Sequence, residues 1–196
     1  MKIGLIGMAF IATLGTSAFA QDMYVGGDVV RSTFLDQRGG LEASHESWGW
    51  MLRGGMQITD RYELELGHRD FGKGAVDTSI ELGNVRAQAH ISQTAESNEV
   101  SIIRAFNFKH KGDLFLRLGA SQVKYERETS GYTSVNGQVL QAALSESDRR
   151  TRFVYGIGGR FKVDDNSIIR VEYSKIGNVS PSLSLSSLNI GYEYHF

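Results

Sequence analysis

The last ten residues of the chain, Ser187–Phe196, alternate between two kinds of side chain. Successive side chains of a β-strand point to opposite faces, so one face of this segment would be purely apolar and aromatic. That face carries Leu188, Ile190, Tyr192, Tyr194 and Phe196. The pattern predicts a two-faced strand with an aromatic end, which fits a barrel that closes in lipid better than a soluble domain.

Seven further segments read as strands, and each is long enough to cross a bilayer at a tilt, which takes about 9–11 residues. The eight predicted strands are Met23–Phe34, Ser47–Thr59, Tyr62–Phe71, Asn98–Lys109, Asp113–Glu128, Arg150–Val163, Ser167–Gly177 and Leu185–Phe196. The single proline, Pro181, leaves these strands free to donate their backbone N–H groups. We therefore predict an all-β fold, an eight-stranded antiparallel up-and-down transmembrane β-barrel.

The predicted connections alternate between short and long, as in outer-membrane barrels with short periplasmic turns and longer outer loops. The short ones are Asp60-Arg61, His110–Gly112 and Asp164–Asn166, and the long ones are Leu35–Glu46, Gly72–Ser97, Thr129–Arg149 and Asn178–Ser184. Within the second and third long loops, Leu82–Val85 and Asn136-Gly137 are hairpin signals that could extend the strands as ribbons. Such ribbons could bind a partner by strand addition, or the loops could simply be long and mobile.

Glycine placement indicates which face of the strands points inward. From the second strand onward the apolar face carries Gly54 and Gly159. The polar face carries Gly49, Gly55, Gly67, Gly119, Gly156, Gly158 and Gly191. An eight-stranded barrel has an interior just wide enough for its own side chains, so the glycine-rich polar face should point inward and the bulky apolar face should contact lipid.

The predicted inward face also carries five acidic and five basic residues. They are Asp28, Glu63, Glu65, Glu172 and Glu193, with Arg53, Arg69, Arg117, Arg160 and Arg170. These charges could form a gate across a narrow path, but a solid polar core of neutralising ion pairs is the favoured interpretation.

Aromatic residues cluster near the predicted strand ends and suggest two interfacial girdles. The candidates are Trp48, Trp50 and Tyr155 toward the outside and Tyr62, Phe161, Tyr194 and Phe196 toward the periplasm. Arg104 disturbs this picture because it shares a predicted lipid-facing side with Val100 and Phe106. Either a bulge turns part of that strand, or Arg104 lies close to an interface.

The N-terminus and the composition set further bounds. Lys2, an apolar run from Ile3 to Leu14 and Ala18-Phe19-Ala20 predict a signal peptide over residues 1–20, leaving one barrel domain over residues 21–196. The chain has no cysteine and a net charge of −1, so neither a thiolate metal site nor nucleic-acid binding is expected. Its five histidines show no ligand spacing, and no cofactor or metal is predicted.

The chain resembles the small eight-stranded outer-membrane barrels of the OmpA-like and opacity-protein type. The resemblance lies in Tyr24–Val30 (Y-V-G-G-D-V-V), Tyr155–Tyr173 and Asn189–Phe196 (N-I-G-Y-E-Y-H-F). It implies integral outer-membrane localisation after export through the periplasm, and contact with outer-membrane lipid and lipopolysaccharide. It also implies that the barrel-assembly machinery reads a terminal signal formed by Tyr192, Tyr194 and Phe196.

Such barrels serve many roles, so several functions stay open. The leading hypothesis is a non-enzymatic protein that contributes to envelope structure and displays extracellular loops. The alternatives are an adhesin with a host or matrix ligand at its loops, and a narrow low-conductance channel. A lipid A-modifying enzyme is the least expected, because only His90, Ser92, Glu96 and Glu99 are similar to a Ser-His-Glu set and the surrounding motif is missing.

Overall fold

The computed structural model describes residues 23–38, 41–82, 85–108, 112–135, 138–180 and 183–196. The elements are β1 (Met23–Arg38), β2 (Leu41–Thr59), β3 (Tyr62–Leu82), β4 (Val85–Phe108), β5 (Gly112–Val135), β6 (Gln138–Lys162), β7 (Ser167–Ser180) and β8 (Leu183–His195). Within these residues no helix is long and apolar enough to cross a membrane. The predicted signal peptide lies outside the described residues.

The eight strands close into one barrel in which each strand pairs antiparallel with the next in the chain. β1 and β8 complete the ring, with a register that runs from Tyr24 opposite His195 to Asp36 opposite Leu183. The predicted fold class, strand count and up-and-down topology are therefore confirmed. The described turns at residues 60–61 and 163–166 lie at the same end of the barrel as the start of β1 and the end of β8.

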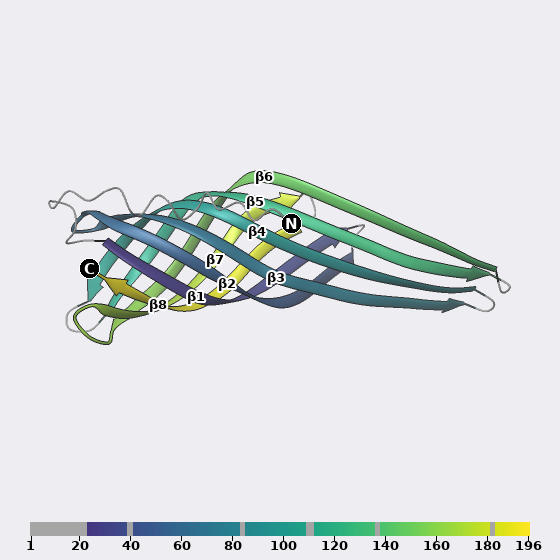
Figure 1. Cartoon of the computed structure of the whole chain (residues 1–196), viewed down its shortest axis with the longest axis horizontal. Helices are drawn as coiled ribbons and strands as arrows, with labels where there is room; N and C mark the ends of the chain where they lie inside the picture. Colours follow the sequence, from purple (N-terminus) through teal and green to yellow (C-terminus); the bar gives the residue numbers. More distant parts are fainter. Residues whose placement is uncertain (1–22, 39–40, 83–84, 109–111, 136–137, 181–182) are drawn as a thin grey trace.

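Four neighbouring strands are longer than the others and extend beyond the barrel (Figure 1). β3 to β6 contain 21, 24, 24 and 25 residues, whereas β1, β2, β7 and β8 contain 16, 19, 14 and 13. β3 ends at Leu82 and β4 begins at Val85, while β5 ends at Val135 and β6 begins at Gln138. The ribbon prediction for these two connections is thus confirmed. We call the part of β3–β6 beyond Gly74 and Ser145 the arm.

The predicted bounds of the other two outer loops were wrong. Most of Leu35–Glu46 belongs to β1 and β2, and much of Asn178–Ser184 belongs to β7 and β8. Polar, glycine-containing segments suggested loops, but backbone hydrogen bonding between neighbouring strands does not depend on side-chain polarity. The ladders therefore continue past the bounds predicted from side chains.

A β-bulge marks the point where β3 leaves β2. The β3–β4 register passes from Asp70 opposite Glu96 to Lys73 opposite Thr94, so β3 contains one extra residue here. Gly72 has φ of +78°, and its N–H donates to the Asp70 carboxylate at 2.7 Å. A side chain at Gly72 would also meet the Trp48 carbonyl oxygen at 2.1 Å. This position therefore requires glycine, and it directs β3 outward into the arm.

Candidate functional site: a filled lumen and a protruding arm

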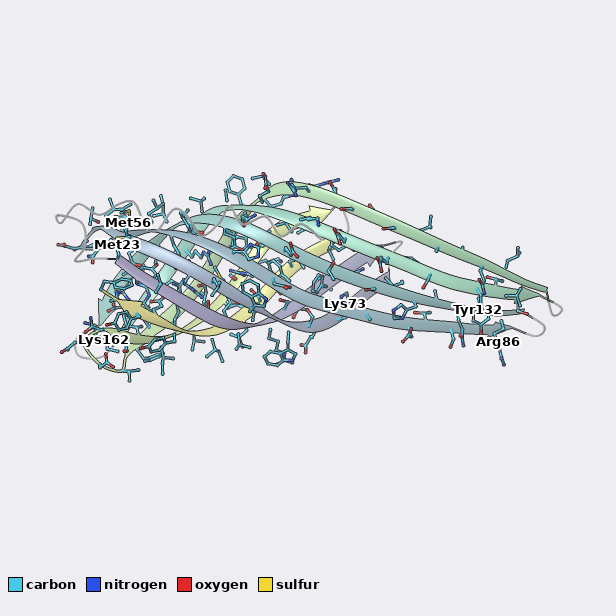
Figure 2. The ribbon with its side chains drawn as sticks, in the orientation of Figure 1. Met23, Met56, Lys73, Arg86, Tyr132 and Lys162 are labelled. Carbon is cyan, nitrogen blue, oxygen red and sulfur yellow. The ribbon has the colours of Figure 1, made fainter. Side chains whose placement is uncertain are left out.

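The inward side chains change character along the barrel axis. Along β7 they run Ile168, Arg170, Glu172, Ser174 and Ile176 from the end that carries the short turns. Along β8 they run Glu193, Asn189, Ser187, Leu185 and Leu183. The lumen thus has a charged inner layer, a small polar middle layer and an apolar outer layer. Figure 2 shows that side chains crowd the barrel part of the molecule and are sparser along the arm.

The inner layer contains all ten charged residues named from the sequence. Arg170 is central, because it donates to Glu65 at 2.7 Å, to Glu193 at 2.7 Å and to Glu172 at 2.5 Å. Arg53 pairs with Asp28. Arg160 makes two hydrogen bonds to Glu63, at 2.6 and 2.8 Å. Arg117 joins Glu172 at 3.1 Å, and Arg69 donates to Ser174 and Ser187.

Glu99 is a member of this network that sequence reasoning missed. It accepts hydrogen bonds from Arg117 at 2.7 Å and from Arg69 at 3.2 Å. It lies on the polar side of β4, between the outward residues Asn98 and Val100. The alternation of β4 carried the signal that would have placed Glu99 inward.

Two aromatic rings also lie within the charged layer. Phe115 is fully buried, with the guanidinium carbons of Arg170 and Arg160 at 4.2 and 5.1 Å from its ring centroid. The Tyr24 hydroxyl donates to Glu65 at 2.8 Å. The rings fill space between charges and supply cation–π contacts.

The outer layer corrects the expectation of a uniformly polar core. Its members form one buried apolar cluster of Phe34, Phe71, Ala95, Val123, Tyr125, Val154, Ile176, Val179, Leu183 and Leu185. Apolar residues at this level close the lumen by packing, whereas charged residues close the inner level by pairing. Arg170, Ser121 and Phe34 have no exposed surface, so each of the three levels is filled by side chains.

The outer surface of the barrel carries a broad band of exposed apolar side chains, including Leu118 at 68 % and Phe153 at 81 %. The seven girdle candidates all lie on this surface: Trp48, Trp50, Tyr62, Tyr155, Phe161, Tyr194 and Phe196. Tyr192 is exposed there too, and Tyr194 contacts Phe196 edge to face at 5.4 Å. Only a lipid environment makes such a surface favourable.

Arg104 lies on the same outward surface, and no bulge interrupts the β4–β5 register around it. Its guanidinium lies 5.9 Å from the Tyr62 ring centroid and 5.0 Å from that of Phe106. Tyr62 is the first residue of β3, next to the short turn. The Arg104 side chain therefore reaches toward the periplasmic interface, as long basic side chains do near membrane boundaries.

The residues of the suggested catalytic pattern are not brought together. His90 contacts Asp77 through Nδ1 at 2.6 Å, in the arm, while Glu99 is buried in the lumen network. Ser130 lies opposite His90 in the β4–β5 register, but no hydrogen bond joins them in the described structure. The described residues also include no cluster of three or more metal-ligating side chains.

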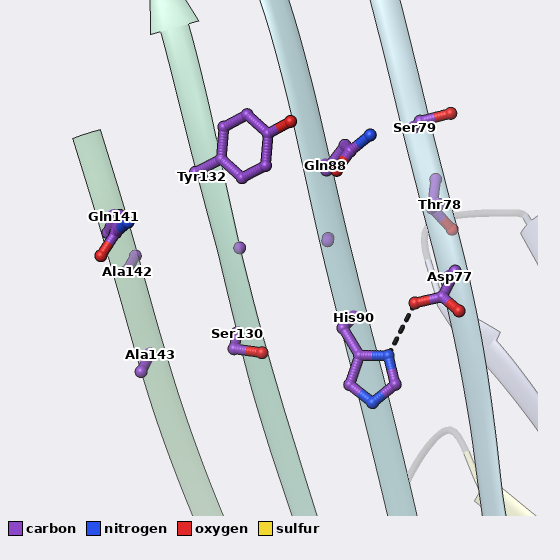
Figure 3. Close-up of a pocket in the computed structure, with 12 residues that line it drawn as sticks. Asp77, Thr78, Ser79, Gln88, His90, Ser130, Tyr132, Gln141, Ala142 and Ala143 are labelled. Carbon is purple, nitrogen blue, oxygen red and sulfur yellow. Dashed lines mark hydrogen bonds and ion pairs between the residues drawn. The ribbon is translucent and has the colours of Figure 1, made fainter. Parts of the chain in front are cut away.

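One surface of the arm holds a shallow groove of about 710 Å³ across its four strands (Figure 3). Ser79, Gln88, Tyr132 and Gln141 form one cross-strand row, and Asp77, His90, Ser130 and Ala143 form the next. The groove mixes polar side chains with alanines, and its two rings are those of Tyr132 and His90. The arm as a whole is the largest surface that the barrel presents beyond the lipid band (Figure 1).

Comparison with protein families identifies this architecture. A family described as the outer membrane protein beta-barrel domain matches residues 6–196. The chain belongs to this family. It is therefore an integral β-barrel of the outer membrane, as the resemblance implied. No curated protein sequence matches the chain.

Solved structures show the same fold at low identity. Ail, the attachment invasion locus protein of Yersinia pestis, solved with the heparin analogue sucrose octasulfate, gives a TM-score of 0.58 at 18% identity over 89% of this chain and 98% of Ail. Neisserial surface protein A gives 0.52 at 13% identity, over 89% and 97% of the two chains. OprG of Pseudomonas aeruginosa gives 0.52 at 9% identity, over 91% and 98%.

Proposed function

We propose that this barrel is a non-enzymatic anchor that displays the arm outside the cell as a binding surface, which makes it an adhesin-type protein. The observation that carries the proposal is the length of β3–β6, which continue well beyond the lipid band with each strand paired to its neighbour among the four. A structural anchor alone would not need four paired strands in solvent, whereas an extended sheet offers both faces and edges to a partner.

The filled lumen argues against the channel alternative. Arg170 and Glu172 are fully buried in the inner layer, and Phe34 and Leu185 are fully buried in the outer layer. Opening a water path would require two unlike layers to rearrange together. In planar bilayers we expect no discrete conductance steps, either for the native chain or for a Leu185→Ala variant; clear steps from the native chain would support the channel instead.

Lipopolysaccharide is the lipid partner that the charges favour. Lys124 and Arg149 lie directly opposite each other on β5 and β6, farther out than Phe153. Like charges in opposite positions are unfavourable unless an anion lies between them. The Glu126 carboxylate lies 2.6 Å from the Lys124 ammonium and raises the pKa of Lys124, and a lipid phosphate would add a second anion beside Lys124 and Arg149. We expect a Lys124→Gln/Arg149→Gln variant to co-purify with less lipopolysaccharide than a Lys73→Gln control.

Shortening the arm tests the main proposal without opening the barrel. Thr129 pairs with Leu144, so residues 130–143 can be replaced by an Asn-Gly turn that preserves the ladder below. Residues 77–90 can be replaced in the same way, because Val76 pairs with Ile91. We expect each shortened protein to keep the heat-dependent gel shift of a folded barrel but to lose binding of cells to matrix proteins, host cells or heparin. Unchanged binding by both would refute the proposal.

A further inference from the structure

β6 has an unpaired outer edge over the whole arm. It pairs with β5 from Gln138 onward, but its pairing with β7 begins only at Val154. At the base, the Arg152 guanidinium donates to the Asn178 carbonyl oxygen at 2.5 Å and ties β6 to β7. Beyond that contact, the described part of the chain leaves alternate N–H and C=O groups of β6 open to another strand.

The open segment has the composition of a strand that pairs with other strands. Residues Val139–Ser145 read V-L-Q-A-A-L-S, with no charge, no proline and no glycine. Val139 is 56 % exposed, and Leu140 and Leu144 are each 74 % exposed. Uncharged segments of this length without proline or glycine can pair with another strand when their edge is free.

The opposite edge of the arm differs. Beyond Gly74, β3 also pairs on one side only, with β4. That edge is bordered by the bulge at Gly72 and carries the exposed charges of Lys73 and Asp77. Bulges and charged side chains are the usual protection of an edge strand against pairing. β6 lacks this protection over seven residues, so it is the edge suited to a partner strand.

We propose that the β6 edges of two copies of this chain pair antiparallel, centred on Ala142, and thereby join two cells. The inference rests on the display of the arm outside the cell proposed above. In this register Leu140 lies opposite Leu144 of the second copy on one face of the joined sheet, and Ala142 lies opposite Ala142. Every residue of the seven-residue pairing is uncharged, and Glu146 lies beyond it.

Charge decides the direction of pairing. A parallel, in-register pair would stand two barrels side by side in one membrane and would bring Glu146, Asp148 and Arg150 opposite their own copies. Like charges directly opposite each other are destabilising. The antiparallel pair avoids these contacts, and it reverses the direction of one arm. The two barrels then point away from each other, which requires two facing membranes.

The shape of the molecule permits this arrangement. β1, β2, β7 and β8 end well below the far end of β3–β6, so the end of the arm stands clear of the rest of the barrel (Figure 1). A second arm can approach the β6 edge there without meeting its own membrane. The joined arms would form one continuous sheet of eight strands.

Cysteine pairs test both the direction and the register, because the native chain contains no cysteine. Opposite Cα atoms in an antiparallel pair are about 4.5–5.5 Å apart, within the range that a disulfide can bridge. Cells carrying Ala142→Cys with one epitope tag are mixed with cells carrying Ala142→Cys with another tag and oxidised. We expect disulfide dimers that contain both tags.

Two further variants separate antiparallel from parallel pairing. Val139 should lie opposite Ser145 of the second copy, so a mixture of V139C cells and S145C cells should form two-tag dimers. V139C alone should form none, because its two thiols would lie about 20 Å apart along the strands. Dimers of V139C alone, or Ala142→Cys dimers that contain a single tag only, would overturn the inference in favour of contact within one membrane.

Charge reversal gives an independent measurement on living cells. Leu140→Lys/Leu144→Lys places lysine opposite lysine, so these cells should form at least about tenfold fewer aggregates. Leu140→Glu/Leu144→Glu cells should behave in the same way, and a mixture of the two populations should aggregate again. An Ala75→Lys control at an exposed position of the β3 edge should leave aggregation unchanged, and each variant should keep the gel shift of a folded barrel.

The outcomes separate this inference from the proposed function. Absence of two-tag dimers, with matrix and heparin binding retained, refutes self-pairing and leaves the adhesin proposal standing. Two-tag dimers without any matrix or heparin binding support self-pairing and count against a host ligand. Failure of the Lys and Glu populations to aggregate together would also refute the inference.

Discussion

Replacing Arg170 by methionine should destabilise the barrel strongly. Arg170 has no exposed surface and donates to Glu65, Glu193 and Glu172 at 2.7, 2.7 and 2.5 Å. Methionine fills similar space without the charge, so three buried carboxylates would lose their common partner. Removing one member of a buried ion-pair network costs about 3–5 kcal/mol of the free energy of unfolding.

Urea unfolding of the protein in lipid vesicles measures this effect through the fluorescence of Trp48 and Trp50, both on the outer surface. With a urea dependence of about 2 kcal/mol per molar, the midpoint should fall by about 1.5–2.5 M. Arg31→Met is the matched control. The Arg31 side chain is 50 % exposed and lies 2.6 Å from Glu46, and a surface pair of this kind contributes about 0.2–1 kcal/mol. Equal, small shifts for both variants would refute the reasoning.

Three further outcomes are expected. Gly158→Val should lower the free energy of unfolding by about 1–3 kcal/mol, because a Cβ there would meet the Phe115 ring at 2.3 Å. Gly177→Ala should lower it little, because the nearest atom to its Cβ would lie at 3.7 Å. Denaturation of both variants checks this. Val100→Arg should lower the free energy of unfolding by about 2–4 kcal/mol, because it places a charge deep in the lipid band. Arg104→Leu should change this free energy by less than about 1 kcal/mol. Equal effects would mean that Val100 and Arg104 lie at the same depth in the membrane. Hydrogen bonds from the backbone of Asn166 and the side chain of Ser167 lower the pKa of Asp164. The stabilisation of this turn should therefore be complete above about pH 4 and should be lost as the pH falls through the lowered pKa. NMR titration of the Asp164 carboxyl would follow this change.

The sequence predicted the strands and their faces because both depend on local alternation. Leu114 and Leu116 could be assigned to lipid, and Arg117 to the interior, from a period of two alone. The glycines of the polar face supported the same assignment. Glu99 was missed even though its own strand alternates, because it was considered only as a member of the candidate Ser-His-Glu set.

Alternation predicts which face of the sheet a residue lies on but not its position along the barrel axis. The sequence therefore could not predict features that depend on that position. Arg104 was correctly placed on the lipid side, but only its contacts with Tyr62 and Phe106 show that it reaches toward an interface. The apolar outer layer was not foreseen for the same reason. Phe34 and Leu185 belong to segments whose inward residues were judged mainly by their charged members.

The amino-acid sequence by itself determined that the chain forms a barrel in the outer membrane, because exposed apolar faces and crowded polar faces have no other stable arrangement. Tertiary structure alone decided which charges meet: Arg53 reaches Glu172, 119 positions away, only because the ring closes with one particular stagger between strands. It also decided how far the strands extend. Backbone hydrogen bonds between neighbours continue wherever a partner strand lies alongside, whatever the side chains, and so four strands build the arm while β6 is left with a free edge.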